Sequence, residues 1–152
     1  MDKMKVRKAN KKDVKEYTKL VKKSNQEYQK IVGKKIKFTE KQIKKDFNEF
    51  TKSKNKMILL ADGEDKLAGY LAASIFINSY RKIGYIDNIF IDDNHRKKGI
   101  ATKLFDEFVK ILRKRKIRKI KLGVNIRNKR AIGFWKNLGF KTYHYDMEKE
   151  LK

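Results

Sequence analysis

A basic, glycine-containing loop is the part of this sequence whose residue types and spacing most clearly allow chemistry. Residues 92–102 read Asp-Asp-Asn-His-Arg-Lys-Lys-Gly-Ile-Ala-Thr, between an apolar run and an amphipathic run. Gly99 and Ala101 would let the backbone of a strand-to-helix turn approach a ligand closely, with the free amides of the first helical turn aimed at one place. Such a helix N-terminus, with the three positive charges of residues 96–98, would bind a pyrophosphate. The alternative is an ordinary basic loop before an ordinary helix, since Arg-x-x-Gly-x-Ala alone is a weak signal.

The spacing of apolar residues predicts the elements that must position this loop. Helices are expected from the cap Asn10 to Gly33, after the cap Thr39, and over 99–115 and 128–138. Strands are expected over 5–8, 57–61, 67–77, 84–91, 117–124 and 140–147. The resulting order is β-α-α-β-β-β-α-β-α-β, with no repeat, linker or proline. This order predicts one α/β domain of residues 1–152 with a mixed sheet.

Composition excludes several kinds of site. The chain has 152 residues and no Cys, which rules out a disulfide scaffold, a thiolate zinc site and a catalytic thiol; with only two His, no metal site is expected.

The chain is strongly basic: its 42 Lys+Arg against 18 Asp+Glu give a net charge of +24. Net charges of +13, −3 and +14 fall on residues 1–56, 57–95 and 96–152. The excess suggests a polyanionic partner, namely nucleic acid, an anionic membrane surface or a phosphorylated cofactor, or else a lysine-rich solvated surface.

No membrane-spanning or signal segment is recognisable in the sequence. The longest apolar stretch, 67–77, is far shorter than the ~20 residues that span a bilayer, and the first five residues include no apolar signal core. A cytoplasmic protein without a membrane partner is therefore expected.

A second motif supplies the context that the basic loop lacks alone. Residues 128–140 read Asn-Lys-Arg-Ala-Ile-Gly-Phe-Trp-Lys-Asn-Leu-Gly-Phe. In its two motifs, their spacing, its element order and its length, the chain resembles the GNAT family of N-acetyltransferases, which move acetyl from acetyl-CoA to an amine. The resemblance implies a mixed, mostly antiparallel central sheet whose central strands splay apart, flanked by helices.

The resemblance also implies acetyl-CoA as cosubstrate and assigns its contacts. Backbone groups of the strand before the loop would pair with the pantetheine arm, and one amide there would stabilise the oxyanion. Loop amides would hold the pyrophosphate. Asn128 would touch the pantetheine, although a plain helix cap is an equal alternative, and Trp135 would pack against the pantetheine or the core. The implied cofactor-binding residues are Ile89, Phe90, Ile91, Arg96, Lys97, Lys98, Gly99, Ile100, Ala101, Thr102, Asn128 and Trp135.

Asp87 is the candidate for the base that deprotonates the amine. Strict alternation places it on one strand face with Tyr85, Ile89 and Ile91, and an acid in so apolar a strand needs an explanation. Members of the family often carry Glu near this point, so the shorter Asp would act through water. The alternative is an ion pair with Arg or Lys from a neighbouring strand.

The proton for the leaving thiolate has no obvious donor. Many members of the family place a Tyr where this chain has Trp135, and an indole cannot act as an acid near neutral pH. Water could protonate the thiolate, or Tyr143 or Tyr145 on the predicted last strand could replace the missing Tyr; packing at a sheet edge is the alternative for both.

Two functions follow from this sequence. The first is an acetyl-CoA-dependent N-acetyltransferase in which a primary amine of a small molecule or a protein attacks directly in a ternary complex. The alternative is a catalytically weak module of the same fold whose basic surface docks on RNA, a ribosome or an acidic protein. Without an RNA- or DNA-binding motif, nucleic acid is expected only as a nonspecific partner. The chain is expected to be a monomer or a homodimer.

Overall fold

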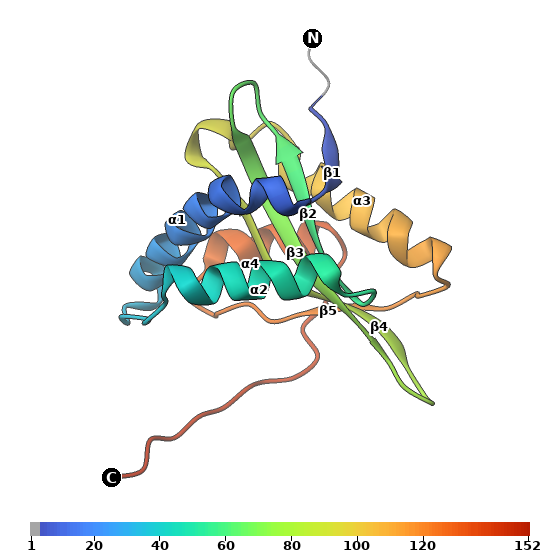
Figure 1. Ribbon diagram of the computed structural model, residues 1–152. Coiled ribbons are helices and arrows are strands. Elements are labelled where there is room, and N and C mark those ends of the chain that lie inside the picture. The colour runs from blue at the N-terminus through green and yellow to red at the C-terminus, as the bar shows by residue number, and fades with distance from the viewer. Residues whose placement is uncertain (1–3) are drawn as a thin grey trace.

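The computed structural model describes residues 4–152 and shows a five-stranded sheet with helices on both faces (Figure 1). The strands stand in chain order, β1-β2-β3-β4-β5; the first four are antiparallel, and β5 runs parallel to β4. This confirms the predicted fold class, an α/β domain with a mixed, mostly antiparallel sheet. The elements are β1 (Val6–Lys8), α1 (Val14–Val32), α2 (Glu40–Lys52), β2 (Lys56–Asp62), β3 (Leu67–Ile77), β4 (Lys82–Ile91), α3 (Ile100–Lys114), β5 (Ile120–Leu122) and α4 (Lys129–Asn137), with short 3-10 turns η1 (Lys11–Asp13) and η2 (Asp93–His95).

Two apolar clusters bury the two faces of the sheet. On one face α1 and α2 lie side by side and contribute Tyr17, Leu20, Ile43 and Phe47 to a cluster with β2, β3 and β4. On the other face α3 and α4 contribute Leu104, Phe108, Leu112 and Trp135. β2 and β3 are buried on both faces, which explains why the middle of the sequence is apolar and nearly free of Lys.

The sheet opens between β4 and β5. The two strands pair only from Gly84 with Ile120 to Ile86 with Leu122. Beyond that point β4 continues for five residues to Ile91, while the chain leaves β5 toward α4. The splayed central strands implied by the resemblance are therefore present, and they leave one edge of β4 free.

A β-bulge in β4 shifts its side chains between the two faces. Ala72 pairs with Asn88 and Ala73 with Ile86, so Asp87 is the extra residue. Ile86 and Ile89 consequently pack in the same cluster, beside α3, which strict alternation would forbid. Asp87 instead bonds to a side chain on the α1–α2 face, as described below. The expectation that Asp87 shares a face with Ile89 and Ile91 is wrong for this reason.

The predicted final strand over 140–147 is also wrong. Residues 138–152 are in no helix or strand, and 141–152 are all exposed. The predicted strand over 117–124 is shorter than expected, because only Ile120–Leu122 pairs. In the part of the chain that the structure describes, no helix combines the length and apolarity that crossing a bilayer requires.

Candidate functional site

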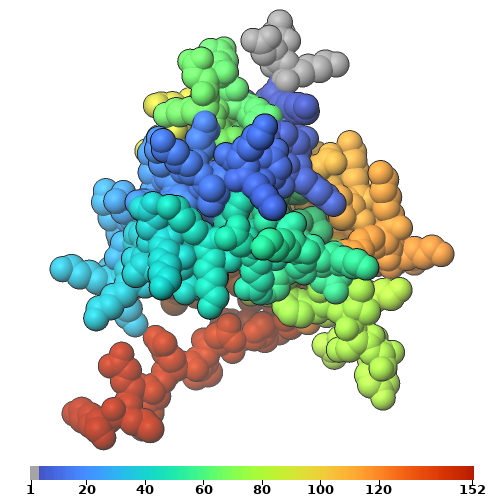
Figure 2. Space-filling view, viewed as in Figure 1, coloured from blue at the N-terminus to red at the C-terminus, as the bar shows by residue number. Residues whose placement is uncertain are grey.

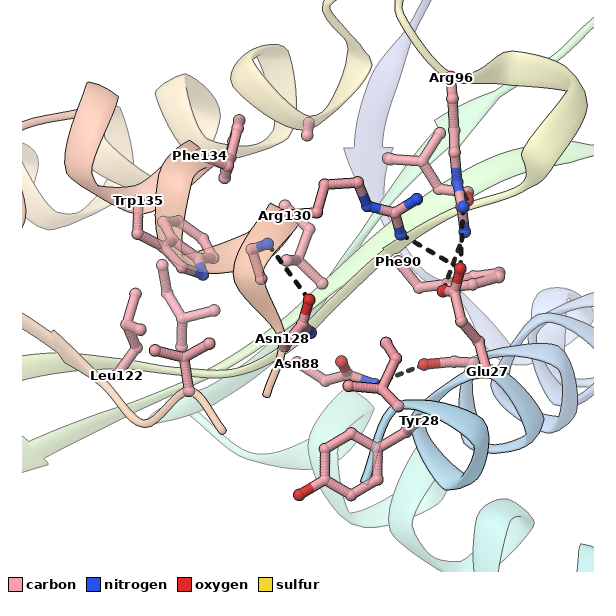
Figure 3. A pocket seen from close by; sticks show the side chains of 18 of the residues that line it. Glu27, Tyr28, Asn88, Phe90, Arg96, Leu122, Asn128, Arg130, Phe134 and Trp135 are labelled. Carbon is pink, nitrogen blue, oxygen red and sulfur yellow. Dashed lines mark hydrogen bonds and ion pairs between the residues drawn. The ribbon is translucent and has the colours of Figure 1, made fainter. Parts of the chain in front are cut away.

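A cavity of about 750 Å³ lies between α1, the end of β4, the loop before α3 and the segment that joins β5 to α4 (Figure 3). Its walls come from residues within 24–31, 86–91, 95–102, 122–125 and 128–135. The volume is that of a small-molecule site. Segments widely separated in the sequence, including both motifs, thus meet around one space.

The free edge of β4 forms one wall of this cavity. Residues 87–91 line the cavity on the side where β5 has separated. Backbone N–H and C=O groups that point to this side have no strand to pair with. The amide of Asp92 donates to the carbonyl of Ala68 on β3, so by alternation the backbone groups of Phe90 also face β3, and those that face the free edge belong to Ile89 and Ile91. The carbonyl of Ile91 accepts from Arg96, which leaves the amide of Ile91 and both groups of Ile89 for an extended ligand that pairs as an added strand would. The expected contact with the backbone of Phe90 is therefore wrong. The side chains of residues 89–91 are turned to the two cores, with Phe90 facing α1 and α2 and the two Ile facing α3.

The amides at the start of α3 form the second wall. Within residues 4–152, no protein acceptor receives the amides of residues 97–102; the first helical hydrogen bond runs from the amide of Lys103 to the carbonyl of Gly99, 3.1 Å. Lys97 and Gly99 both adopt positive φ, 62° and 75°, which turns the chain into the helix. A Cβ on Gly99 would meet no atom within 4 Å, so the space beside the loop is open. Unpartnered amides at a helix N-terminus fit a phosphate.

Individual loop residues differ in what they offer to a ligand. Lys97, Ala101 and Thr102 line the cavity, and the side chain of Lys98 lies outside its lining. The side chain of Ile100 is 2% exposed and belongs to the core below α3, so only its backbone can serve a ligand.

Arg96 lines the cavity, and its side chain is also held by protein partners. Its guanidinium forms ion pairs with Glu27 of α1 at 2.8 Å and Asp93 at 2.9 Å, and its Nε donates to the carbonyl of Ile91 at 2.9 Å. It also lies over the ring of Phe90. Figure 3 shows Glu27 between Arg96 and Arg130, which it also contacts, at 3.1 Å. Arg96 therefore anchors the loop to α1 and β4.

Glu27 was not predicted from the sequence. Burial alone would raise its pKa, but the hydrogen bonds and charges of Arg96 and Arg130 outweigh burial and hold the pKa below its usual range. The only available signal was its place beside the inward face of α1, next to Ser24 and Tyr28 in the apolar spacing. Its partners are 69 and 103 residues away along the chain.

Asp87 lies on the cavity wall at the bulge of β4. It accepts a 2.7 Å hydrogen bond from the hydroxyl of Ser74 on β3. Ser74 stands between Ala73 and Ile75, which pack beneath α3, so Ser74 and the carboxylate that it contacts lie on the α1–α2 face. Partial burial raises the pKa of Asp87, whereas the Ser74 hydrogen bond and the charge of Lys56 act in the opposite direction. No ion pair to Asp87 within 4.0 Å forms in the described chain, so the predicted alternative role is not seen.

A neutral network next to Asp87 was also missed in the sequence. The amide of Asn88 donates to the hydroxyl of Tyr70 at 2.6 Å and to that of Ser24 at 3.3 Å. Tyr70 is 1% exposed, and burial raises its pKa. Ser24 and Asn88 line the cavity. The network fixes the side chain of Asn88 and links β4 to α1 across the cavity floor.

The second motif contributes both Asn128 and Trp135 to the cavity lining. The side-chain oxygen of Asn128 accepts a hydrogen bond from the amide of Ala131, 3.2 Å, so this residue caps α4 and still faces the cavity. Trp135 is 5% exposed and packs against Phe105, Phe134 and Phe140. Its main role is in the core, with one side at the cavity.

Tyr143 lies outside the cavity. It follows α4 in the exposed segment, its side chain is 64% exposed, and its ring contacts Lys121. The role expected for it rested on a final strand that does not form. Tyr28 on α1 is the tyrosine that lines the cavity. Among residues 4–152, no group of three metal-ligating side chains converges as a metal site would require.

Solved structures share this fold over nearly the whole chain. A tetramutant of the BH1408 protein from Bacillus halodurans superposes with a TM-score of 0.86 at 22% identity, covering 97% of this chain and 100% of that one. The aminoglycoside acetyltransferase AAC(6′)-Iy, in complex with the bisubstrate analogue CoA-S-monomethyl-acetylneamine, superposes with a TM-score of 0.82 at 16% identity, covering 99% of each chain. At these identities the likeness is one of fold.

Sequence comparison supplies the family. An uncharacterised N-acetyltransferase of Methanocaldococcus jannaschii, MJ1207, is 40% identical over 60 residues, which are 40% of this chain and 26% of that protein. The match thus spans about a quarter of the relative's length. The model of the acetyltransferase (GNAT) family matches residues 17–140, a range that includes most of α1, the basic loop and the second motif. The chain therefore belongs to the GNAT family of acetyltransferases.

Proposed function

We propose that this protein transfers an acetyl group from acetyl-CoA to a primary amine by direct attack in a ternary complex. One observation carries the proposal: a single cavity joins unpartnered amides of the loop before α3, the free edge of β4 and the carboxylate of Asp87. The amides provide a site for an anion, the edge of β4 provides a site for an extended ligand, and the carboxylate provides a base. Acetyl transfer from acetyl-CoA to an amine needs all three.

Different residues of the chain would contact successive parts of the acetyl donor, acetyl-CoA. Amides of residues 97–102 and the charge of Lys97 would hold the pyrophosphate at the N-terminus of α3. The backbone of Ile89 and the amide of Ile91 would align the pantetheine arm, with the free amide nitrogen of Asn128 beside it. Support comes from AAC(6′)-Iy, a structure of the same fold whose complex contains a CoA-linked analogue.

Asp87 would accept the proton of the attacking amine, directly or through one water molecule. The amine nitrogen then forms a bond to the acetyl carbon as the carbon–sulfur bond breaks, and a backbone amide of 89–91 stabilises the transient oxyanion. The thiolate takes a proton from water, because Trp135 is held in the core and Tyr143 lies outside the cavity. The raised pKa of Asp87 makes it a stronger base than an ordinary carboxylate while it remains ionised.

An amine panel tests this proposal. Acetyl-CoA is incubated with small primary amines, polyamines, aminoglycosides and peptides, and free thiol is followed with a chromogenic disulfide. The chain has no cysteine, so it contributes no thiol of its own. We expect amine-dependent thiol release and a product 42 Da heavier than the acceptor, a mass that follows from replacing hydrogen by acetyl. Binding of acetyl-CoA without release by any amine would favour the binding module.

A further inference from the structure

Three segments that are rich in cations and free of acids meet at the end of the sheet opposite the cavity. They are residues 52–56 around the turn between α2 and β2, residues 76–82 around the hairpin turn between β3 and β4, and residues 113–119 at the end of α3. Together they hold eleven Lys and Arg and no Asp or Glu. Figure 1 shows the end of α3 and the hairpin on one side of the molecule, and both project there in Figure 2. We call the three segments the basic end.

Hydrogen bonds hold the three segments together. The guanidinium of Arg115 donates to the backbone carbonyl of Lys54 and to the side-chain oxygen of Asn55, each at 3.0 Å. The amide of Gly84, at the base of the hairpin, donates to the carbonyl of Lys119 at 2.9 Å. The basic end is therefore one surface that the fold assembles from distant parts of the sequence.

The cations of residues 113–119 are left without acidic partners. Six of these seven residues are Lys or Arg, and five of the six are exposed. None of the six forms an ion pair within the part of the chain that the structure describes. The helix dipole favours cations in the last turn of a helix, which accounts for Arg113 and Lys114. It does not account for the cations that follow the helix, namely Lys116, Arg118 and Lys119.

Lys116 occupies a backbone position that favours glycine. Its φ is 59°, and its amide donates to the carbonyl of Arg113 at 3.0 Å. Helices commonly end with glycine in this left-handed conformation, because a Cβ makes the conformation unfavourable. A lysine here lowers the stability of the fold relative to glycine and adds a charge to the basic end. Backbone strain of this kind is concentrated at functional positions.

The hairpin turn adds exposed aromatic rings to these charges. Tyr80 is 93% exposed and Phe76 is 57% exposed, and Arg81 and Lys82 follow Tyr80 directly. The turn is fixed by the side-chain oxygen of Asn78, which accepts from the amides of Tyr80 at 2.9 Å and Arg81 at 2.8 Å. Proteins bind single-stranded nucleic acid with this combination, because bases stack on the rings and phosphates pair with Lys and Arg.

We propose that the basic end binds single-stranded RNA without sequence preference, with a base stacked on Tyr80 and phosphates on the cations of residues 113–119. RNA presents unstacked bases of this kind in its loops, bulges and ends. An acidic peptide or a nucleic-acid duplex would use the charges and leave the rings without a role.

The basic end and the cavity are separate sites. β4 runs from Lys82 at the basic end to Ile91 at the cavity, a span of about 30 Å at about 3.3 Å per residue. None of the residues that line the cavity belongs to the basic end. RNA and acetyl-CoA should therefore bind at the same time, and the RNA site does not depend on acetyl transfer.

Fluorescence anisotropy with a fluorescein-labelled oligouridine of about 12 nucleotides tests the stacking contact. We expect Tyr80→Ala to weaken binding about tenfold, since one stacked base is lost. Tyr80→Phe keeps the ring and should retain the affinity of the original protein. Saturating acetyl-CoA should leave the RNA bound. Full affinity of Tyr80→Ala, or displacement of the RNA by acetyl-CoA, would overturn the proposal.

The salt dependence of binding tests the phosphate contacts. A variant with Lys114→Gln, Lys116→Gln and Arg118→Gln loses three cations, so the slope of log affinity against log salt should become shallower by about 2. The matched control carries Lys15→Gln, Lys19→Gln and Lys30→Gln on the exposed side of α1 and has the same net charge. Its slope should equal that of the original protein. Equal changes in the two variants would mean diffuse attraction to the net charge, which would contradict a defined site.

Lys116→Gly separates RNA binding from folding. Glycine removes the unfavourable Cβ at positive φ, so the midpoint of denaturant unfolding should rise while the affinity for the oligouridine falls. A variant that is more stable and binds RNA as well as the original protein would exclude Lys116 from the site. A polyglutamate peptide that displaces the RNA equally from the original protein and from Tyr80→Ala would assign the surface to an acidic protein instead.

Discussion

The hydroxyl of Ser74 on β3 donates a 2.7 Å hydrogen bond to the carboxylate of Asp87, the extra residue of the β4 bulge. The bulge turns this carboxylate away from Ile89 and Ile91 and toward the α1–α2 face of the sheet. The proposed base is therefore positioned by an irregularity of the strand. Burial raises its pKa, and the Ser74 hydrogen bond and the charge of Lys56 oppose that rise.

Asp87→Asn removes the proposed base while preserving shape. We expect the rate of acetyl transfer at neutral pH to fall by about 10²–10⁴, the usual contribution of a positioned base. The loss should shrink at high pH, where the amine is already deprotonated. The measurement is kcat/KM against pH for both proteins, with Asp106→Asn on the exposed side of α3 as the matched control. An equal loss at every pH would remove the base role from Asp87.

Ser74→Ala shifts the pH dependence instead of abolishing the activity. The Ser74 hydrogen bond lowers the pKa of Asp87, so without it that pKa rises further above its usual range. Because Asp87 works only when ionised, the acidic limb of the pH–rate profile should move to higher pH, with the plateau rate retained. The amine titrates identically in both proteins and cannot cause the difference. If the acidic limb of the pH–rate profile does not move, Asp87 is not the group whose ionisation controls the rate.

Glu27→Gln tests the anchor between α1 and the basic loop. The carboxylate of Glu27 pairs with Arg96 and Arg130, and its side chain is 31% exposed, so we expect a loss of about 1–2 kcal/mol in the free energy of unfolding at pH 7. The pKa of Glu27 is lowered in the folded state, so this stabilisation is present above the unfolded pKa of about 4.3. It disappears as the pH falls through the folded value.

Denaturant unfolding at pH 7 and near pH 3 measures this difference. The difference in the free energy of unfolding between the original protein and Glu27→Gln should be smaller at the lower pH. Glu64→Gln, in the exposed turn between β2 and β3, removes the same charge without an ion pair and should change stability little. An equal difference in the free energy of unfolding at both pH values would mean that the ion pairs of Glu27 do not stabilise the protein.

The sequence allowed us to predict those features that depend on local residue patterns. Apolar periodicity indicated the four helices and the apolar strands, and two motifs indicated the loop at Gly99 and the start of α4 at Asn128. The bulge at Asp87 escaped prediction because it arises from the pairing of β3 with β4, and a single strand seen alone appears to alternate regularly. Glu27 escaped because its partners are distant in sequence. The final strand was wrongly expected because alternation shows that a segment can pair, but not that an edge within the same chain receives it.

The direct test of the central claim, that the loop at the start of α3 holds the phosphates of acetyl-CoA, is a calorimetric titration of two glycine variants. Gly99 and Gly139 both adopt positive φ, 75° and 93°, and a Cβ at either would meet no atom within 4 Å. Gly99→Asp places a negative charge at the proposed phosphate site, whereas Gly139→Asp adds the same strain and charge after α4, outside the cavity. We predict that Gly99→Asp abolishes acetyl-CoA binding and that Gly139→Asp retains the affinity of the original protein. Near-normal binding by a folded Gly99→Asp variant would contradict the account.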